Sequence, residues 1–434
     1  MKYYLETYGC QMNEADSEVV ASILENSGLI RTEDPKEADI ILVNSCAVRE
    51  NAEKRALARL SQYKGYKKDP EVMLGLLGCV PARKQDQLLE KYPFIDIIMG
   101  PDSYRELKKV LSENQYPISN TELSNQELYD NIEPKRQEGL NAWISIMRGC
   151  NQFCSYCIVP FTRGRERSRP FESIINEARE IAYQSIPQIT LLGQNVNAYK
   201  YKDYRFPDVL EGVAQVDEIR RIRFMSPHPK DFTDRMLEVM KKYDNICNHI
   251  HLPLQSGSSK ILSAMNRTYT KEDYLELVNK IKSILPDIAL TTDIIVGFPG
   301  ETDEDFKDTL DVMDQVGFDN AFMFQYSPRP GTSAAKHLED NIPYDTKNAR
   351  LQKIIKKQHT ATQKKNQELV GERIEVLIEG TSKKREDELV GRTESDKLVI
   401  LKAGQGNIGE FMDVKIIGTA GVSLFGEIPA KSED

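Results

Sequence analysis

Three cysteines stand close together near the middle of this 434-residue chain, at Cys150, Cys154 and Cys157. Three residues separate the first pair and two the second, so one short loop carries three thiols. Soft thiolates select zinc, copper(I) or iron–sulfur clusters. A closed zinc site needs four ligands, commonly as two closely spaced pairs, and no histidine stands nearby. The spacing therefore favours a four-iron cluster with one open iron over a zinc knuckle or three unrelated thiols.

An open iron of this kind suggests a particular cofactor. It can chelate the amino and carboxylate groups of S-adenosylmethionine, and electron transfer into the sulfonium then breaks a C–S bond and yields a carbon radical. Tyr156, directly before the last cysteine of the triplet, offers an aromatic face to a nucleoside.

Three further cysteines are far apart in the sequence but share a local pattern. Cys10 follows KYYLETYG, Cys46 ends the apolar run ADIILVNSC, and Cys79 ends the run EVMLGLLGC. Helical patterns separate these runs, and strand–helix–strand alternation predicts a parallel sheet. Ligand sites in such sheets lie at the carboxyl ends of the strands, so the three thiols are expected to converge there. The alternative is three buried core thiols.

The elements that must position these cysteines predict an α/β multidomain chain. Residues 1–120 are expected to form a parallel α/β domain, and the polar segment 112–138 a linker. Repeated strand–helix units in 136–367 predict a complete or partial (β/α) barrel, with its site at the strand C-termini. The triplet follows its first strand, expected at 142–149. Five short strands within 368–432 predict a small β-barrel.

Composition sets broad limits on the class of protein. Hydrophobic residues make up 40% of the chain and charged residues 29%, and no stretch approaches the ~20 apolar residues of a membrane span. The N-terminus turns polar at once, unlike a secretory signal. We therefore expect a soluble cytoplasmic protein, as a monomer. The cysteine count of seven is odd, which disfavours a full set of disulfides, and Cys247 matches no motif and is expected to be structural.

The loop GCNQFCSYCIVPFTRGRERSRP resembles the cluster loop of the methylthiotransferase family within the radical S-adenosylmethionine superfamily. Further blocks resemble the family's motifs in the family's order, over nearly the whole chain: YGCQMNEADSE, NSCAVRENAEKR, LLGQNVNAY, HLPLQSGS, TDIIVGFPGET and YSPRPGTSAA. The resemblance implies two [4Fe-4S] clusters, with Cys10, Cys46 and Cys79 holding an auxiliary cluster that supplies sulfur. It also implies two molecules of S-adenosylmethionine, one methylating sulfur and one generating the 5'-deoxyadenosyl radical, and an electron donor of unknown identity.

Residues beside the N-terminal cysteines distinguish the branches of this family. Gln11-Met12-Asn13 and Ala47-Val48-Arg49-Glu50 resemble the branch that acts on N6-isopentenyl-adenosine at position 37 of the tRNA anticodon loop. Other branches act on threonylcarbamoyl-adenosine in tRNA or on a ribosomal protein. A non-catalytic iron–sulfur protein that binds RNA and senses redox state, or a zinc-bound RNA-binding module, are alternatives from another class. Pro227 and the sequence GCVPAR around Cys79 depart from the usual motifs.

Residues at the predicted strand ends are candidates for holding the cofactor. Gly193-Gln194-Asn195 replaces a glycine-rich turn that meets the cofactor's amino group in many relatives, and Gln255-Ser256 is expected to reach the ribose. Asp293 and Gly297-Phe298 lie where backbone contact with adenine is common in the superfamily. Packing or turn roles are the alternative for each, and His228 is expected to be structural.

Basic residues beside the triplet and near the C-terminus are candidates for RNA contact. The net charge of −9 argues against such a partner, but local patches decide nucleic-acid binding. Arginines next to the cluster loop are expected to follow a phosphate backbone, and the terminal barrel resembles a TRAM domain, which is associated with RNA binding. The alternative is a charged turn that pairs with acidic neighbours. The candidates are Arg148, Arg163, Arg165, Arg167, Lys383, Lys384 and Arg385, and the expected partner is a tRNA anticodon stem-loop.

Overall fold

The computed structural model describes residues 1–68, 72–85, 87–112, 116–136, 139–383 and 385–429. The chain forms two compact units. The first unit contains Met1–Tyr183, Thr190–Val209 and Arg329–Lys336, and the second contains Gln184–Ile189, Leu210–Pro328 and His337–Asp434.

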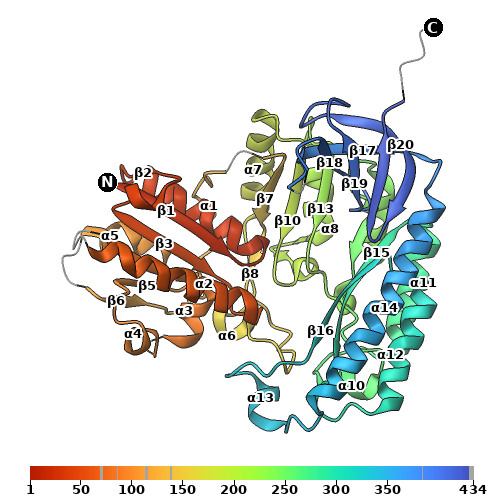
Figure 1. The fold of residues 1–434 in the computed structure, drawn as a ribbon, viewed down its shortest axis with the longest axis horizontal. Coiled ribbons are helices and arrows are strands. Elements are labelled where there is room, and N and C mark those ends of the chain that lie inside the picture. The colour runs from red at the N-terminus through yellow and green to blue at the C-terminus, as the bar shows by residue number, and fades with distance from the viewer. Residues whose placement is uncertain (69–71, 86, 113–115, 137–138, 384, 430–434) are drawn as a thin grey trace. The chain divides into compact units, whose positions relative to one another are not determined.

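A six-stranded parallel sheet forms the N-terminal part of the first unit, as the sequence predicted (red and orange in Figure 1). Its strands, in spatial order, are β2 (Ile30–Arg31), β1 (Lys2–Tyr8), β3 (Ile40–Ser45), β4 (Met73–Gly78), β5 (Ile97–Met99) and β6 (Ile118–Asn120). The helices are α1 (Gln11–Glu25), α2 (Glu50–Tyr63), α3 (Cys79–Lys84), α4 (Gln87–Lys91) and α5 (Leu107–Ser112). Every residue of β3 is buried, which is typical of a parallel strand covered on both faces.

Successive residues of β3 point into two separate cores. Ile41 and Val43 pack with Leu60 of α2, whereas Ile40 and Leu42 pack with Val20 of α1. The first unit thus has helices on both faces of the sheet, and the loops that follow the strands meet at one edge. The predicted linker is partly wrong: 118–120 forms β6, and Tyr129, 3% exposed, belongs to the core with α1.

The remainder of the first unit carries the cysteine triplet. The strand expected at 142–149 is divided into β7 (Asn141–Ser145) and β8 (Met147–Arg148). Strand β8 pairs antiparallel with β9 (Arg167–Ser168), so the loop that carries the cysteine triplet is closed at its base. The other elements up to residue 214 are α6 (Val159–Arg163), α7 (Phe171–Tyr183), β10 (Gln188–Leu192), β11 (Lys200–Tyr201), β12 (Tyr204–Arg205) and α8 (Phe206–Ala214). The first two residues of β10 and the last five of α8 belong to the second unit.

The second unit continues the strand–helix alternation. Strands β14, β15 and β16 form a parallel sheet, and α12 and α14 pack with it through Phe306, Met313 and Ile354. Among the described residues the strands of this sheet do not close on themselves, in keeping with a partial barrel. Its elements are β13 (Arg221–Phe224), α9 (Asp234–Lys242), β14 (His249–His251), α10 (Ser259–Ala264), α11 (Lys271–Ile284), β15 (Ala289–Val296), α12 (Asp303–Val316), β16 (Asn320–Gln325) and α14 (Tyr344–Glu368). Helix α13 (Ser333–His337) belongs to the first unit except for its last residue.

Five strands at the C-terminus close into a barrel, as the sequence predicted (blue in Figure 1). In spatial order they are β17 (Arg373–Thr381), β18 (Glu388–Thr393), β19 (Leu398–Lys402), β21 (Ser423–Glu427) and β20 (Phe411–Ala420). Val376, Val399 and Val414 are fully buried in its centre. Register shifts at Ile378/Gly380 and Ile416/Gly418 bend the strands so that the sheet can close. None of the helices in the described ranges is long and apolar enough to cross a bilayer.

Two buried arginines of β13 hold this barrel within the second unit. Arg221 donates to the carbonyl of Arg392 at 2.6 Å and to that of Glu375 at 3.0 Å. Arg223 donates to the carbonyls of Thr393 and Glu394, both at 2.8 Å. Charged donors make stronger hydrogen bonds than neutral ones, so these carbonyls fix the barrel on β13.

Replacing Arg223 by alanine is expected to lower the free energy of unfolding of the second unit by about 2–3 kcal/mol, because the two carbonyls lose their donor while they stay partly buried. Denaturant unfolding followed by circular dichroism measures this. Arg235→Ala is the matched control: Arg235 is 55% exposed and 3.7 Å from Glu211, and such surface pairs contribute less than about 1 kcal/mol. Equal losses in the two variants would contradict the anchoring role of Arg223.

Candidate functional site

Cys10, Cys46 and Cys79 all lie at one edge of the N-terminal sheet. They follow β1, β3 and β4, and these strands are neighbours. The register pairs Tyr8 with Ser45 and Ser45 with Gly78, so the three strands end side by side. The thiols are close enough to interact: the side chains of Cys10 and Cys46 are hydrogen-bonded, and Cys10 and Cys79 influence one another electrostatically.

The backbone around these cysteines admits few other residues. Gly78, with φ of +95°, turns β4 directly into α3, whose first residue is Cys79. A Cβ on Gly78 would lie 2.3 Å from Oδ1 of Asn44 and 2.6 Å from the carbonyl of Ser45. The amide of Asn44 donates to the carbonyl of Asn13 at 3.0 Å, and Asn13 Oδ1 accepts from the backbone N–H of Cys10. Buried amides therefore tie the Cys10 turn to the end of β3.

The electrostatics of this edge favour a thiolate. The hydrogen bond with Cys46 lowers the pKa of Cys10 to about 6, and the positive charge of Arg163 acts in the same direction. The same hydrogen bond and burial raise the pKa of Cys46. Burial also raises the pKa of Cys79, against the opposing effect of Arg163. The positive charge of Arg163 beside the three thiols would stabilise them as anionic ligands.

Backbone hydrogen bonds and one close backbone contact hold the triplet loop. The N–H of Cys150 donates to the carbonyl of Gly164 at 3.1 Å, and that of Cys157 to the carbonyl of Cys154 at 2.9 Å. A Cβ on Gly149, with φ of +77°, would lie 2.0 Å from the carbonyl oxygen of Arg165. This close approach explains the glycine directly before the first cysteine.

Two of the predicted cofactor residues in the first unit contact this loop. Oε1 of Gln194 accepts a hydrogen bond from the N–H of Gly149. Nδ2 of Asn195, 1% exposed, lies 3.5 Å from the carboxylate of Glu166, which also accepts from the N–H of Asn151 at 3.0 Å. Gly193 packs against Met147, since its Cβ would lie 2.7 Å from Cγ of that residue. Tyr156 is partly exposed in the loop. Cofactor contact by these residues stays a prediction.

Three of the four arginines expected to follow a phosphate backbone are not available to RNA. Arg148 and Arg163 are 2% and 3% exposed, and Arg167 has a 7% exposed side chain paired with Asp102. For these three, the RNA prediction is wrong because the chain satisfies their charges internally. Arg165 is exposed, with its guanidinium 4.3 Å from the ring centre of Phe153, so its RNA contact stays a prediction.

The basic loop of the terminal barrel is only partly described. Arg385 is 68% exposed at the side chain and pairs with Glu388 at 3.1 Å, and Lys383 is exposed. Lys384 lies outside the described residues. RNA contact by this loop stays a prediction.

The remaining predicted cofactor residues belong to the second unit, where Asp293 lies within β15 and the others follow β14 or β15. The N–H of Gln255, which has φ of +68°, donates to the carbonyl of Asp293 at 2.8 Å. Ser256 is fully buried. Gly297 has φ of +70°, and a Cβ there would lie 2.4 Å from Cγ of Lys347. Phe298 is fully buried against Tyr326, with ring centres 5.0 Å apart. The structure thus groups Gln255 with Asp293, whereas the ring of Phe298 serves packing.

One face of the β14–β16 sheet carries groups that the sequence did not single out. Phe322 and Phe324 of β16 are 48% and 42% exposed, although they are aromatic. Phe322 is paired in register with Asp293, so the two share a face. His251 lies on this face as well, 3.3 Å from Asp293 and 5.8 Å between ring centres from Phe322. The sequence signal that could have revealed this face was the alternation along β16, since the strand NAFMFQ places both phenylalanines on one side of the sheet.

The two other singled-out side chains are structural. His228 is 6% exposed, and burial lowers its pKa to about 3. Cys247 is 2% exposed, and burial raises its pKa. In both residues burial disfavours the charged form of the side chain. This agrees with the structural roles expected of them. No disulfide joins any of the seven cysteines, all of which lie in the described ranges.

The thiols present suit iron–sulfur clusters, which soft thiolate ligands bind. Within the described ranges, no three cysteine, histidine, aspartate or glutamate side chains gather as ligands of one ion. A four-iron cluster binds each thiolate to a different iron, so its ligands need not meet at one point. Arg163 supplies the second sign of fit: its Nη1 is buried and has no hydrogen-bond acceptor in the described structure. The sulfur atoms of a cluster are acceptors.

Glu18 of α1 titrates abnormally near this site. It is 8% exposed, and burial raises its pKa to about 8, with Glu177 and Glu14 adding to the shift and Arg136 opposing it. In the unfolded chain the pKa of this carboxyl is near 4.5. Between about pH 5 and pH 8 the carboxyl is therefore ionised in the unfolded chain but still protonated in the folded chain. Stability therefore falls as pH rises through this window.

Glu18→Gln is expected to remove this decrease of stability with rising pH, because glutamine does not ionise. Relative to the wild type, the variant gains about 2–4 kcal/mol in unfolding free energy between pH 5 and pH 8. Urea unfolding at the two pH values measures it. A constant difference between the two proteins at both pH values would contradict the raised pKa.

Comparison with known proteins covers almost the whole chain. The radical SAM superfamily model matches residues 144–313, the model of an uncharacterised protein family, UPF0004, matches 2–100, and the TRAM domain model matches 367–428. A protein of Porphyromonas gingivalis strain W83 is 47% identical over 439 residues, covering 98% of this chain and 95% of its own. A Bacteroides fragilis protein is 46% identical, with the same coverage. Both are named tRNA-2-methylthio-N(6)-dimethylallyladenosine synthase.

Among solved structures, the chain is similar to the radical S-adenosylmethionine methyltransferase TsrM from Kitasatospora setae. The TM-score is 0.55 at 14% identity, with 77% of each chain covered. The cobalamin-dependent radical enzyme OxsB gives a TM-score of 0.53 at 14% identity, covering 81% of this chain and 56% of that one. At these identities the likeness concerns the fold alone.

Proposed function

This chain belongs to the family of the tRNA-2-methylthio-N(6)-dimethylallyladenosine synthases within the radical S-adenosylmethionine superfamily, and from that premise we propose that it inserts a methylthio group at C2 of N6-isopentenyl-adenosine at position 37 of tRNA. The observation that carries the proposal is the 47% identity to such a synthase across 98% of the chain. Three domain models match the chain in support of this proposal: that of UPF0004 over the cysteine-bearing α/β domain, that of the radical SAM superfamily, and that of the TRAM domain over the terminal barrel.

The two sets of thiols would hold two clusters. We assign Cys150, Cys154 and Cys157 to the cluster that binds S-adenosylmethionine, and Cys10, Cys46 and Cys79 to an auxiliary cluster. When bound, the first cluster and its cofactor supply a carbon radical, which is needed because C2–H of adenine is an aromatic bond that acids and bases cannot readily activate. Gln194 supports the triplet loop at Gly149. In the second unit, Gln255, Ser256, Asp293 and Gly297 remain candidates for cofactor contact.

The exposed aromatic face supports an apolar substituent on the substrate base. We propose that Phe322 and Phe324 contact the isopentenyl group, because their rings are about half exposed on the face that also carries Asp293. A threonylcarbamoyl group is polar and charged and would gain little there. Arg165, Lys383 and Arg385 are the exposed cations that we assign to RNA contact.

The test is an anaerobic assay of the cluster-reconstituted protein on two anticodon stem-loops. One carries isopentenyl-adenosine at position 37 and the other threonylcarbamoyl-adenosine, and nucleosides are identified by mass spectrometry. We expect the methylthio product on the first RNA only. Product on the second only would keep the chemistry and overturn the substrate. No product on either, with the cofactor still cleaved, would point to a protein substrate, and no cleavage at all would favour a non-catalytic iron–sulfur protein.

A further inference from the structure

A buried carboxylate joins the two segments that flank the cysteine triplet. Oδ1 of Asp16 accepts from Nη1 of Arg148 at 2.8 Å, and Oδ2 accepts from Nη2 of Arg163 at the same distance. The side chains of all three are at most 4% exposed. Arg148 lies two residues before Cys150, Arg163 six residues after Cys157, and Asp16 is on the helix that begins after Cys10. One side chain of the N-terminal domain therefore binds both flanks of the triplet loop.

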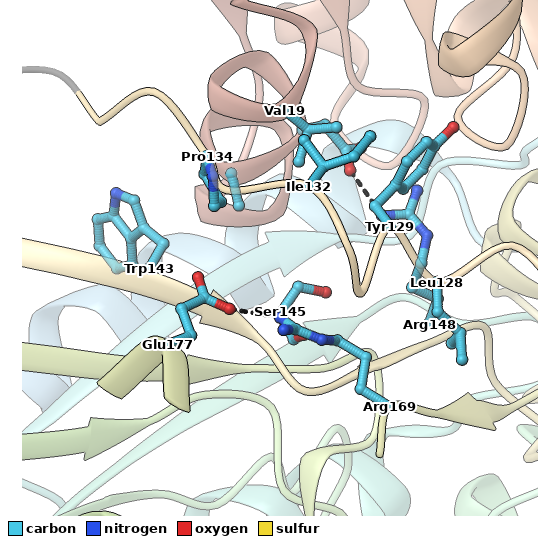
Figure 2. A pocket seen from close by; sticks show the side chains of 12 residues that line it. Val19, Leu128, Tyr129, Ile132, Pro134, Trp143, Ser145, Arg148, Arg169 and Glu177 are labelled. Atoms are coloured by element: carbon cyan, nitrogen blue, oxygen red, sulfur yellow. Dashed lines mark hydrogen bonds and ion pairs between the residues drawn. The ribbon is translucent and has the colours of Figure 1, made fainter. Parts of the chain in front are cut away.

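The arginine on the strand side has further support that keeps it in place. Nη2 of Arg148 donates to the carbonyl of Pro101 at 2.8 Å, and its guanidinium lies 4.9 Å from the ring centre of Tyr129. Figure 2 shows the two side chains against one another at the wall of a small cavity that Asp16 also lines. Burying a charge costs several kcal/mol unless it is paired, so these contacts hold the network rigidly.

Arg163 reaches from this network to a cluster thiol. Its Nε lies 3.2 Å from Sγ of Cys79 and donates to it. Its Nη2 is used by Asp16, whereas Nη1 is buried and finds no acceptor in the described residues. One donor of the guanidinium thus binds a thiol of the auxiliary site, and a second is buried with no acceptor among the described residues.

We infer that Arg163 is a positioning residue of the auxiliary cluster: it donates to the Cys79 thiolate and, through Asp16, ties that cluster's edge to the triplet loop. This inference rests on the proposed auxiliary cluster. Hydrogen bonds to the sulfur atoms and nearby positive charge stabilise the reduced, more negative form of a cluster and raise its reduction potential. Arg163 therefore raises the potential of the auxiliary cluster as well as holding it in place.

The experiment isolates the auxiliary cluster in the full chain, with Cys150, Cys154 and Cys157 replaced by alanine. Arg163→Gln and Arg163→Lys are made in this background and titrated electrochemically, with the reduced cluster followed by electron paramagnetic resonance. In Arg163→Gln we expect the ratio of reduced to oxidised cluster at a fixed potential to fall about tenfold, which for one electron corresponds to 59 mV. Arg163→Lys keeps the charge and should fall between this variant and the parent.

The matched control is Arg179→Gln, which changes an exposed arginine of α7 that contacts Asn176 and should leave the midpoint at the parent value. A full iron content with an unchanged midpoint in Arg163→Gln would overturn the inference. If that variant fails to fold, a parental midpoint in Arg163→Lys would overturn it equally. The measurement uses no RNA and no turnover, so a wrong substrate leaves it intact. A parent protein that assembles no four-iron cluster would instead refute the auxiliary cluster of the proposed function.

Discussion

Cys154→Ala is expected to abolish formation of 5'-deoxyadenosine, the product of reductive cleavage of S-adenosylmethionine, while the protein stays folded. Cys154 is the middle thiol of the triplet and is 9% exposed. Its backbone carbonyl accepts the hydrogen bond of the Cys157 N–H, and alanine keeps that carbonyl. Two thiolates on one loop no longer hold the cluster, so the open iron is lost with it. We expect a fall of more than about 100-fold, measured by chromatography of the reaction mixture under dithionite.

The control for this variant is Cys247→Ala, which removes a buried thiol outside both cysteine sets. It should lose no more than about 1–2 kcal/mol of stability and keep its cleavage rate and iron content. Circular dichroism of both variants checks folding. Cleavage at the wild-type rate in Cys154→Ala would show that the triplet does not hold the reactive cluster.

Cys46→Ala is expected to separate the two halves of the proposed reaction. Cys46 is 1% exposed at the end of β3, hydrogen-bonded to Cys10, and its loss removes one ligand of the auxiliary cluster. The hydrogen bonds of the triplet loop to Gly164 and Gln194 do not involve Cys46, and the Asp16–Arg163 pair is unchanged in this variant. We therefore expect methylthio-adenosine to fall below detection while 5'-deoxyadenosine is still formed, within about tenfold of the wild-type rate.

Both products are quantified from the same reaction on the isopentenyl stem-loop. Cys247→Ala again serves as the control and should form both in wild-type proportion. Full product formation by Cys46→Ala would remove the sulfur-supplying role from the N-terminal cysteines. Loss of both products together would mean that the two sites do not assemble independently.

The three-domain organisation was predictable from local patterns. The alternation of apolar runs and helical segments predicted the N-terminal parallel sheet, and short strands separated by glycine predicted the terminal barrel. The triplet was recognisable because its three cysteines are neighbours in sequence. The edge formed by Cys10, Cys46 and Cys79 was also predictable, since parallel strands end on one side of a sheet and each cysteine follows a strand.

The roles of the arginines were beyond the sequence. Arg148, Arg163, Arg165 and Arg167 look alike in a linear pattern, yet only Arg165 is exposed. The partners that distinguish them, Asp16 and Asp102, lie more than 40 residues away along the chain. An arginine that is exposed at the surface and an arginine that is paired in the core can stand in the same local sequence, so the pattern does not distinguish them.

Residue types and spacing by themselves determined which groups this chain offers for chemistry: two sets of three thiols, strand ends to carry them, and a barrel that matches the TRAM domain model. Only the tertiary structure decided which charges face solvent and which face the thiols. The physical reason is that a thiolate's ligand chemistry is intrinsic to the residue, whereas the exposure and pairing of a guanidinium depend on long-range packing. Asp16 shows this most clearly, because its partners are set by where α1 packs and not by its neighbours in sequence.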